Sequence, residues 1–202
     1  PYMSHLYIEG ESLNNYFQNH EATLKNKVDH FLTICDALEH LHQKLIWHKN
    51  LSSGNLIITK EDIPVFLNYG ISKTIKTKTS VSEYNQKIDL VIESLNYMSP
   101  EEASGKFEEM NECSEIYSLG VILYELCTSQ LPYDIQQCDI FLALTKIREE
   151  LPWPPSIYNT EIPPPLEWII LKALAKEKAH RYQYVSELKL DINNFLIGAE
   201  VS

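Results

Sequence analysis

The sequence has 202 residues, of which 44% are hydrophobic, so it is long enough to bury one sizeable core and predicts one compact domain. Aspartate and glutamate together number 28 against 17 lysine and arginine residues, which gives a formal charge of −11 and a pI near 5.1. This acidic balance excludes a general binder of nucleic-acid phosphate backbones and favours solubility.

The spacing of the cysteines and the hydropathy of the chain indicate its cellular compartment. The four cysteines are widely scattered and form no C-x-x-C pair, which argues against a zinc site or a disulfide framework. The sequence therefore predicts a reducing, cytoplasmic environment. No apolar run approaches the roughly 20 residues of a membrane-spanning helix, and no secretory signal is visible. Because the chain begins with Pro1, we allow that it is a fragment of a longer protein.

The N-terminal part predicts a short strand at residues 1–6, followed by a helix with Ser12 as its N-cap. Apolar residues then recur every three or four positions in residues 27–44, which predicts a long amphipathic helix. His40 and His42 lie near the end of this helix. Because they are two positions apart, they face different sides and do not share a metal ion. We expect them to face solvent or to interact with the helix dipole.

A hairpin with polar residues at its open ends follows. Two short apolar runs, residues 56–59 and 64–67, are separated by a polar turn and predict two antiparallel strands. The polar residues at the two ends are His48, Lys49, Asn50 and Asn55 before the hairpin, and Asn68, Tyr69 and Gly70 after it. Because a hairpin brings its open ends together, we expect Asn55 and Asn68 to lie close to each other.

Residues 73–87 are rich in Lys, Thr and Ser and lack hydrophobic periodicity, so they predict a surface loop. The loop contains several candidate phosphate acceptors: Thr74, Thr77, Thr79, Ser80 and Ser82. The next segment that carries a pattern, residues 94–101, reads SLNYMSPE.

The second half of the chain predicts helices. The most apolar segment, residues 115–129, reads EIYSLGVILYELCTS and predicts a buried central helix. Three further helices are expected at residues 139–150, 166–175 and 185–196. A proline-rich connection at 151–165 predicts irregular extended structure, and we expect its Trp153 to be buried against neighbouring helices.

Several of these segments resemble protein kinase motifs. The polar residues around the hairpin resemble the catalytic loop H-R-D-L-x-x-x-N and the metal-binding D-F-G. SLNYMSPE resembles G-T-x-x-Y-x-[AS]-P-E at the end of the activation loop, and EIYSLGVILYELCTS resembles the central-helix motif D-x-[YW]-S-x-G-x-x-L-[YW]-E-L-x-[TS]-G. The last helices are similar to those of bacterial-type serine/threonine kinases. The chain is therefore identified as a member of the protein kinase superfamily.

The resemblance covers essentially all 202 residues, but only the large, C-terminal lobe of a kinase. It implies a mainly α fold, helical with one or two short β-hairpins. The small lobe is absent, because the chain has no G-x-G-x-x-G loop and no V-A-I-K strand lysine to orient ATP. Within one domain, residues 1–202, the resemblance places the hinge at 5–13, the catalytic loop at 46–55, the metal loop at 68–70, the activation segment at 68–101, the central helix at 115–129 and the closing helices at 166–198.

The resemblance also places uncharged side chains where an active kinase has charged ones. Asn50 corresponds to the catalytic aspartate that accepts the substrate proton, and Ser52 to the lysine two residues later. Asn55 and Asn68 correspond to the two residues that hold Mg²⁺ on ATP. An amide lacks both the charge that holds a cation and the basicity that accepts a proton near neutral pH. The motifs are therefore pseudokinase-like.

Other residues are expected to preserve the frame of the site. The residues that maintain the fold in the family, and take no part in its chemistry, correspond to His48, Glu101, Glu115 and Arg181. Glu101 and Arg181 match a buried kinase ion pair, and Glu115 replaces an aspartate that braces the catalytic loop. Lys49 replaces an arginine that binds a phosphate of the activation loop, and lysine can do so only as a point charge.

We expect a pseudokinase-type protein-interaction or regulatory module with little or no phosphotransfer, no required cofactor and another protein as its partner. The alternative is a divergent ATP-dependent protein serine/threonine kinase whose small lobe precedes Pro1 and which binds ATP and Mg²⁺ weakly. The residues alone decide neither whether the chain is enzymatically active nor its oligomeric state.

Overall fold

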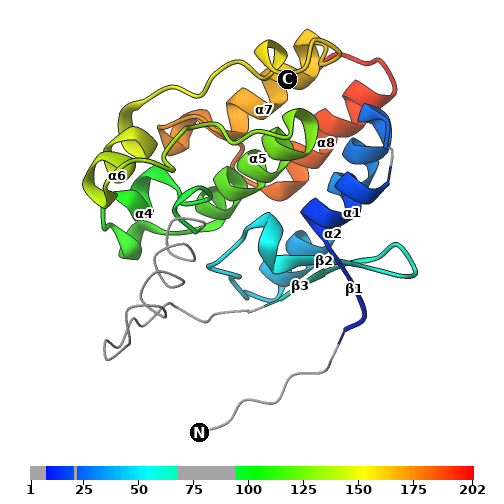
Figure 1. The fold of residues 1–202 in the computed structure, drawn as a ribbon, viewed down its shortest axis with the longest axis horizontal. Coiled ribbons are helices and arrows are strands. Elements are labelled where there is room, and N and C mark those ends of the chain that lie inside the picture. Colours follow the sequence, from blue (N-terminus) through cyan, green and yellow to red (C-terminus); the bar gives the residue numbers. More distant parts are fainter. Residues whose placement is uncertain (1–7, 21, 68–93) are drawn as a thin grey trace, which may run out of the picture.

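The computed structural model describes residues 8–20, 22–67 and 94–202 of the chain. These residues are mainly helical and contain one small sheet, as predicted (Figure 1). The α-helices are α1 (Leu13–Asn19), α2 (Leu24–Gln43), α4 (Pro100–Ala103), α5 (Glu112–Thr128), α6 (Ile140–Glu149), α7 (Pro164–Ala173) and α8 (Val185–Leu196). The strands are β1 (Gly10–Ser12), β2 (Leu56–Thr59) and β3 (Pro64–Phe66). Short 3₁₀ turns lie at η1 (Ser53–Asn55), η2 (Phe107–Glu109), η3 (Pro155–Ile157) and η4 (Lys178–His180).

The sheet is antiparallel, with the order β1-β2-β3. Strands β2 and β3 form the predicted hairpin, whereas β1 adds a third strand at Gly10–Ser12. The strand expected at residues 1–6 lies outside the described residues. Gly10 is needed where β1 meets β2, because a Cβ at this position would collide with the backbone oxygen of Ile58. The sheet closes one end of the chain's helical part (Figure 1).

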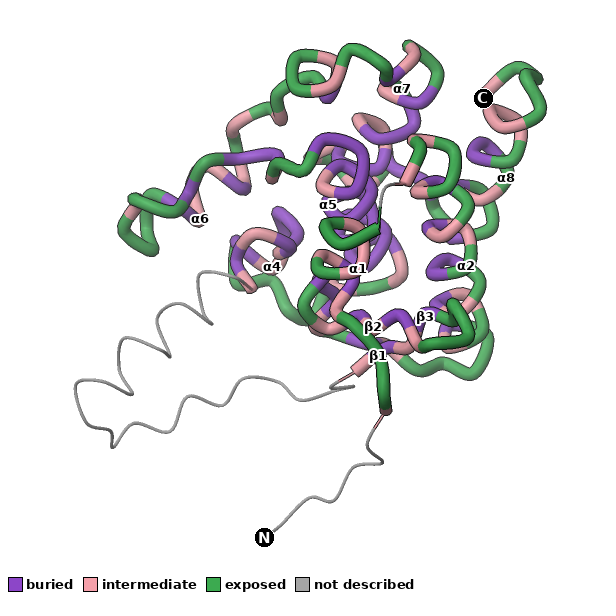
Figure 2. The backbone as a smooth tube through the Cα atoms, turned by 45° about the vertical axis from the view of Figure 1, so that its right-hand side comes forward, coloured by how far each residue is buried: buried purple, intermediate pink, exposed green. Residues whose placement is uncertain are grey.

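Helix α5 forms the centre of the core. Nearly all of its side chains are buried, and Figure 2 shows it as an almost continuous buried segment among the other helices. It begins three residues before the expected start at residue 115, because the side chain of Asn111 caps it and accepts a hydrogen bond from the Cys113 backbone N–H at 3.2 Å. It ends at Thr128, and Ser129 adopts the left-handed conformation.

The surrounding helices pack on α5 and on each other. Helices α2 and α7 both contact α5, and α8 contacts α2 and α7. Gly120 of α5 permits the close approach to α7, since a Cβ there would lie 2.9 Å from Ala173 Cβ. Helix α6 stands apart from this group and packs against α4. None of the helices in the described part of the chain has the length and apolarity that crossing a membrane requires.

The proline-rich connection between α6 and α7 is partly ordered into the turn η3, and its last prolines begin α7. Trp153 in this connection is 54% exposed, so the expectation that it is buried is wrong. Local sequence could not show this, because the burial of Trp153 depends on which distant elements pack over it in the fold.

Candidate functional site

The loop of residues 46–55 connects α2 to the hairpin and lies over the N-terminal end of α5. Lys49 in this loop has a φ of 60°, which a residue with a side chain rarely adopts. Its backbone N–H donates to Glu115 Oε1 at 2.7 Å. Strained backbone of this kind persists only where surrounding contacts fix it. Glu115, from α5, supplies that contact.

Glu115 is itself held by His42, the last buried side chain of α2. His42 Nε2 lies 2.6 Å from Glu115 Oε2, and Glu112 Oε1 lies 3.2 Å from His42 Nδ1 without hydrogen-bond geometry. Burial lowers the pKa of His42, but the hydrogen bond and charge of Glu115, followed by the charge of the nearby Glu112 carboxylate, outweigh it and raise that pKa above 6.5. His42 therefore carries a proton more readily than an ordinary histidine.

The two histidines in the last turn of α2 differ in their exposure. His40 is exposed, but His42 is buried and paired with carboxylates instead of facing solvent. The sequence contains a signal for this burial, because His42 lies four residues after Leu38 and seven after Cys35, both of which are on the buried face of α2.

His48, at the start of the loop, is fully buried against the Phe66 ring, with the two ring centroids 5.3 Å apart. Its Nδ1 accepts the backbone N–H of Asn50 at 3.3 Å. Burial lowers the pKa of His48, although the charge of Glu115 opposes this shift. A neutral His48 thus fixes the backbone of Asn50, the residue predicted to occupy the catalytic-base position.

The two remaining predicted site residues of this loop also belong to its framework. Ser52 is buried, and its carbonyl oxygen accepts the backbone N–H of Asn55 at 3.1 Å. Asn55 Nδ2 donates to the Asn50 carbonyl oxygen at 2.9 Å. The structure therefore brings Asn50, Ser52 and Asn55 together in one loop, whereas Asn68 lies outside the described residues.

A polar network that sequence reasoning missed lies beside the loop. The Tyr97 hydroxyl donates to Glu125 Oε2 at 2.6 Å and also contacts Ser53 Oγ. Asn14 Nδ2 donates to Ser53 Oγ and to Glu125 Oε1, both at 3.0 Å. Burial, followed by the charge of Glu125, raises the pKa of Tyr97, so this hydroxyl stays protonated. The network joins α1, η1 and α5 to Tyr97, near the end of the predicted activation segment.

A cavity of about 730 Å³ opens between this loop, α4 and the start of α5. Its apolar wall includes Trp47, Met98 and Met110, and Asn50 lies on its border. Its described carboxylates are those of Glu102 and Glu115. Glu102 Oε2 accepts from the backbone N–H of Ser99 at 2.9 Å and from its hydroxyl at 2.7 Å, while Glu115 accepts from Lys49, so both carboxylates are engaged in holding the backbone.

The structure also brings Glu101 and Arg181 together. Arg181 Nη1 and Nη2 each lie 2.9 Å from a different carboxylate oxygen of Glu101, and the arginine side chain is fully buried. Burial raises the pKa of Glu101, but the hydrogen bonds and charge of Arg181 outweigh it and hold that pKa below its usual value. The pair joins α4 to the segment before α8.

Asn55, the described residue for which the sequence predicts a metal-binding role, offers little to a cation. Asn55 supplies a neutral amide there, whereas Mg²⁺ is usually bound in proteins through carboxylates and phosphates. Within residues 8–20, 22–67 and 94–202, no cluster of three or more His, Cys, Asp or Glu side chains could hold a metal ion. The described donors therefore do not fit a tightly held Mg²⁺.

The loop and the Glu101–Arg181 pair both lie within the residues that match a protein-family model. The family model for the protein kinase domain matches residues 2–190. The chain belongs to the protein kinase family. This assignment confirms the membership expected from the motifs, and protein kinases generally use ATP with Mg²⁺.

Bacterial protein kinases are among the similar proteins. A probable serine/threonine-protein kinase of Streptomyces coelicolor is 30% identical over 202 residues, which is 100% of this chain and 29% of that protein. Serine/threonine-protein kinase PknB of Mycolicibacterium smegmatis is 31% identical over 95% of this chain and 30% of its own length. PrkC of Bacillus subtilis is 32% identical over 92% of this chain and 28% of its own length. This kinase-family chain thus spans about three tenths of the length of these relatives.

Proposed function

We propose that this chain is a pseudokinase-type protein-interaction or regulatory module with little or no phosphotransfer activity. The observation that carries the proposal is the combination of a well-braced catalytic loop with an amide at its base position. Lys49 and His48 hold the loop through Glu115 and the Asn50 backbone. The side chain at the position that would accept the proton, Asn50, has no basicity near neutral pH.

The described neighbourhood offers no replacement for the missing base. The carboxylates along the cavity, Glu102 and Glu115, already accept hydrogen bonds from backbone N–H groups. Moving either one toward a substrate would break these hydrogen bonds and leave backbone N–H groups without their partners, which is costly. A positioned general base typically contributes about 10² to 10⁴ in rate, so its absence alone lowers turnover severely.

The remaining parts of the proposal follow from the same residues. The neutral amide of Asn55 favours at most weak binding of MgATP, so no cofactor is required for the proposed role. The formal charge of −11 argues against nucleic acid and leaves another protein as the partner. Cysteines in this chain are free, in keeping with a cytoplasmic location.

The alternative is a divergent ATP-dependent protein serine/threonine kinase whose small lobe lies upstream of this chain. The observation in its favour is the intact geometry around Asn55, which still bonds to the Asn50 carbonyl oxygen. A loop kept in this form could serve weak catalysis if a complete ATP site were assembled around it.

Phosphotransfer separates the two proposals. The purified chain, alone and within its full-length protein, is incubated with radiolabelled ATP, Mg²⁺ or Mn²⁺ and a generic acceptor such as casein. We expect incorporation no greater than that of an Asn50→Ala variant. Incorporation that Asn50→Ala or Asn55→Ala abolishes, while the exposed control Asn193→Ala leaves it intact, would establish the active kinase and overturn the pseudokinase.

A further inference from the structure

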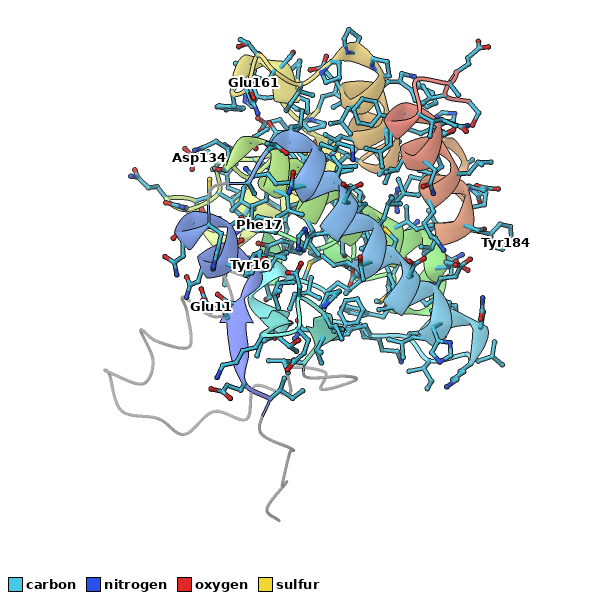
Figure 3. All side chains as sticks on the ribbon, turned by 90° about the vertical axis from the view of Figure 1, so that its right-hand side faces the viewer. Glu11, Tyr16, Phe17, Asp134, Glu161 and Tyr184 are labelled. Atoms are coloured by element: carbon cyan, nitrogen blue, oxygen red, sulfur yellow. The ribbon has the colours of Figure 1, made fainter. Side chains whose placement is uncertain are left out.

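A carboxylate is buried where α8 packs on α7. The side chain of Asp191, on α8, is fully buried, and its Oδ2 accepts the Tyr182 hydroxyl at 2.9 Å. Lys172 Nζ, from α7, lies 3.6 Å from the same oxygen. Figure 3 shows the two helices side by side, with Tyr184 marking the start of α8. Because a buried carboxylate is costly unless its oxygens are hydrogen-bonded, its remaining partners matter for this part of the fold.

The segment after α8 supplies these partners. Gly198 has a φ of 71°, which ends the helix, and the chain then turns back toward Asp191. Ser202 donates to Asp191 Oδ1 from its backbone N–H at 3.0 Å and from its hydroxyl at 2.9 Å, and the hydroxyl lies 3.1 Å from Oδ2. Val201 packs against the hydrophobic core. Residues 198–202, the docked segment, are thus held against α8 by one buried carboxylate.

Lys172 completes the contact from the side of α7. Its Nζ donates to the Ser202 carbonyl oxygen at 2.9 Å. The same Nζ lies 4.6 Å from the centroid of the Trp168 ring and 4.1 Å from that of the Tyr182 ring. The Lys172 side chain is 24% exposed and Trp168 is 43% exposed, whereas Tyr182 is buried. The docked segment therefore lies against a site formed by one cation and two aromatic rings.

A phosphoryl group on Ser202 would turn this attraction into repulsion. Ser202 itself is exposed, so its hydroxyl can be reached when the docked segment opens locally. Phosphorylation removes the O–H donor and adds about 1.5 to 2 negative charges, here beside the buried Asp191 carboxylate. Like charges repel, and burial weakens the screening by solvent. Lys172 carries one positive charge, which cannot balance both anions.

We propose that phosphorylation of Ser202 by a separate serine/threonine kinase releases residues 198–202 from α7 and α8. Ser202 Oγ forms a bond to the γ-phosphorus of ATP, the bond from that phosphorus to the β–γ bridging oxygen breaks, ADP leaves, and the hydroxyl proton passes to the general base of that kinase. Release exposes Lys172 and Tyr182 beside Trp168, and aromatic residues are enriched in protein interfaces. The role of that surface in binding rests on the proposed function, whereas the release does not depend on whether this chain transfers phosphate.

Hydrogen exchange at the Ser202 amide, followed by NMR of the isotope-labelled chain, measures the release. Phosphoserine is placed at position 202 of the whole chain by reassigning its codon. We expect this amide to exchange at the rate of a short unstructured peptide of the same phosphorylated sequence, at least about tenfold faster than in the unmodified chain. Phosphoserine at position 186, an exposed serine of α8, is the matched control and should change the Ser202 rate by less than about twofold.

Ser202→Ala separates the added charge from the lost hydroxyl. The backbone N–H of the variant can still donate to Asp191, so its amide should retain protection of at least about threefold. Removing the phosphate with a phosphatase should restore the slow exchange. The proposal is overturned if phosphoserine leaves the rate unchanged, if it opens the segment no further than Ser202→Ala, or if position 186 has the same effect. Slower exchange after phosphorylation would also overturn it, because Lys172 would then hold the phosphate and keep the segment docked.

Discussion

Arg181 uses every hydrogen-bond donor that an arginine has. Its five N–H groups reach the two carboxylate oxygens of Glu101 and the carbonyl oxygens of Cys113, Ala175 and Lys176. The guanidinium also lies over the Tyr117 ring, 5.0 Å from its centroid. A lysine could not reproduce this set, because it has three donors and no planar fork.

Replacing this arginine should therefore strongly lower the stability of the fold. We expect Arg181→Met to lower the free energy of unfolding by about 3–5 kcal/mol, because the buried Glu101 carboxylate would lose its bidentate partner and keep only the Ser114 hydroxyl and the more distant Lys178, 3.9 Å away. Urea unfolding followed by circular dichroism measures the change. Lys106→Met is the matched control, since it breaks a pair with Glu109 whose side chains are both more than half exposed, and it should cost under about 1 kcal/mol. Equal losses in the two variants would contradict the structural role of Arg181.

At the scale of elements, the loop of residues 46–55, the predicted catalytic loop, is joined to two helices by one carboxylate. Glu115 of α5 accepts the Lys49 N–H from the loop and contacts His42 from α2. The ion pair with His42 makes this junction sensitive to pH.

The pKa of His42 in the folded chain lies above 6.5, so its stabilisation is fully present below pH 6.5 and is lost as the pH rises through the folded-state pKa. The pKa of His48 is lowered, so its effect has the opposite sign and falls below pH 6.5. We therefore expect the free energy of unfolding to decrease from pH 6.5 to 8, and to decrease less in His42→Gln. Urea unfolding at each pH measures both slopes.

His30 provides the control for this slope. Its pKa is also raised, because its hydrogen bond to Asp62 outweighs the effect of burial, but the Asp62 side chain is 56% exposed and solvent screens the pair. His30→Gln should therefore remove a smaller part of the slope than His42→Gln. A slope that stays unchanged in His42→Gln would show that the His42 pair does not contribute.

At the scale of the whole molecule, the sequence is most informative where a pattern is local. The hairpin strand at residues 56–59 and the last helix at 185–196 have the expected bounds. Strands and helices of this kind can be predicted because their hydrophobic patterns involve only neighbouring residues. Strand β1 has no such pattern in its three residues and exists because it pairs with β2. The Asn14–Glu125 contact joins residues 111 positions apart, and no local signal reports it.

The long-range contacts make one core. The hydrophobic cluster of buried residues runs from Ile58 of β2 through Leu123 of α5 to Ile170 of α7, so the sheet and the helices share their stabilisation. A domain with one such core and few separable parts usually unfolds in a single cooperative transition. A local defect at any interface of α5 should then destabilise the entire chain.

Gly120→Ala tests this cooperativity at the α5–α7 interface. The added methyl group would lie 2.9 Å from Ala173 Cβ, and this overpacking should lower the free energy of unfolding by about 1–3 kcal/mol. Far-UV circular dichroism reports the helices. Fluorescence of Trp47 reports the catalytic loop when the other two tryptophans, both exposed, are replaced by phenylalanine.

We expect both signals to give one coincident transition, and Gly120→Ala to shift both by the same amount, although Trp47 is remote from α7 in the sequence. Ser186→Ala, at an exposed position of α8, should shift neither by more than about 0.5 kcal/mol. If the Trp47 transition keeps its midpoint while the helical transition moves, the loop and sheet unfold as a separate unit. The brace formed by Glu115 would then hold the catalytic loop without being coupled to the core beneath it.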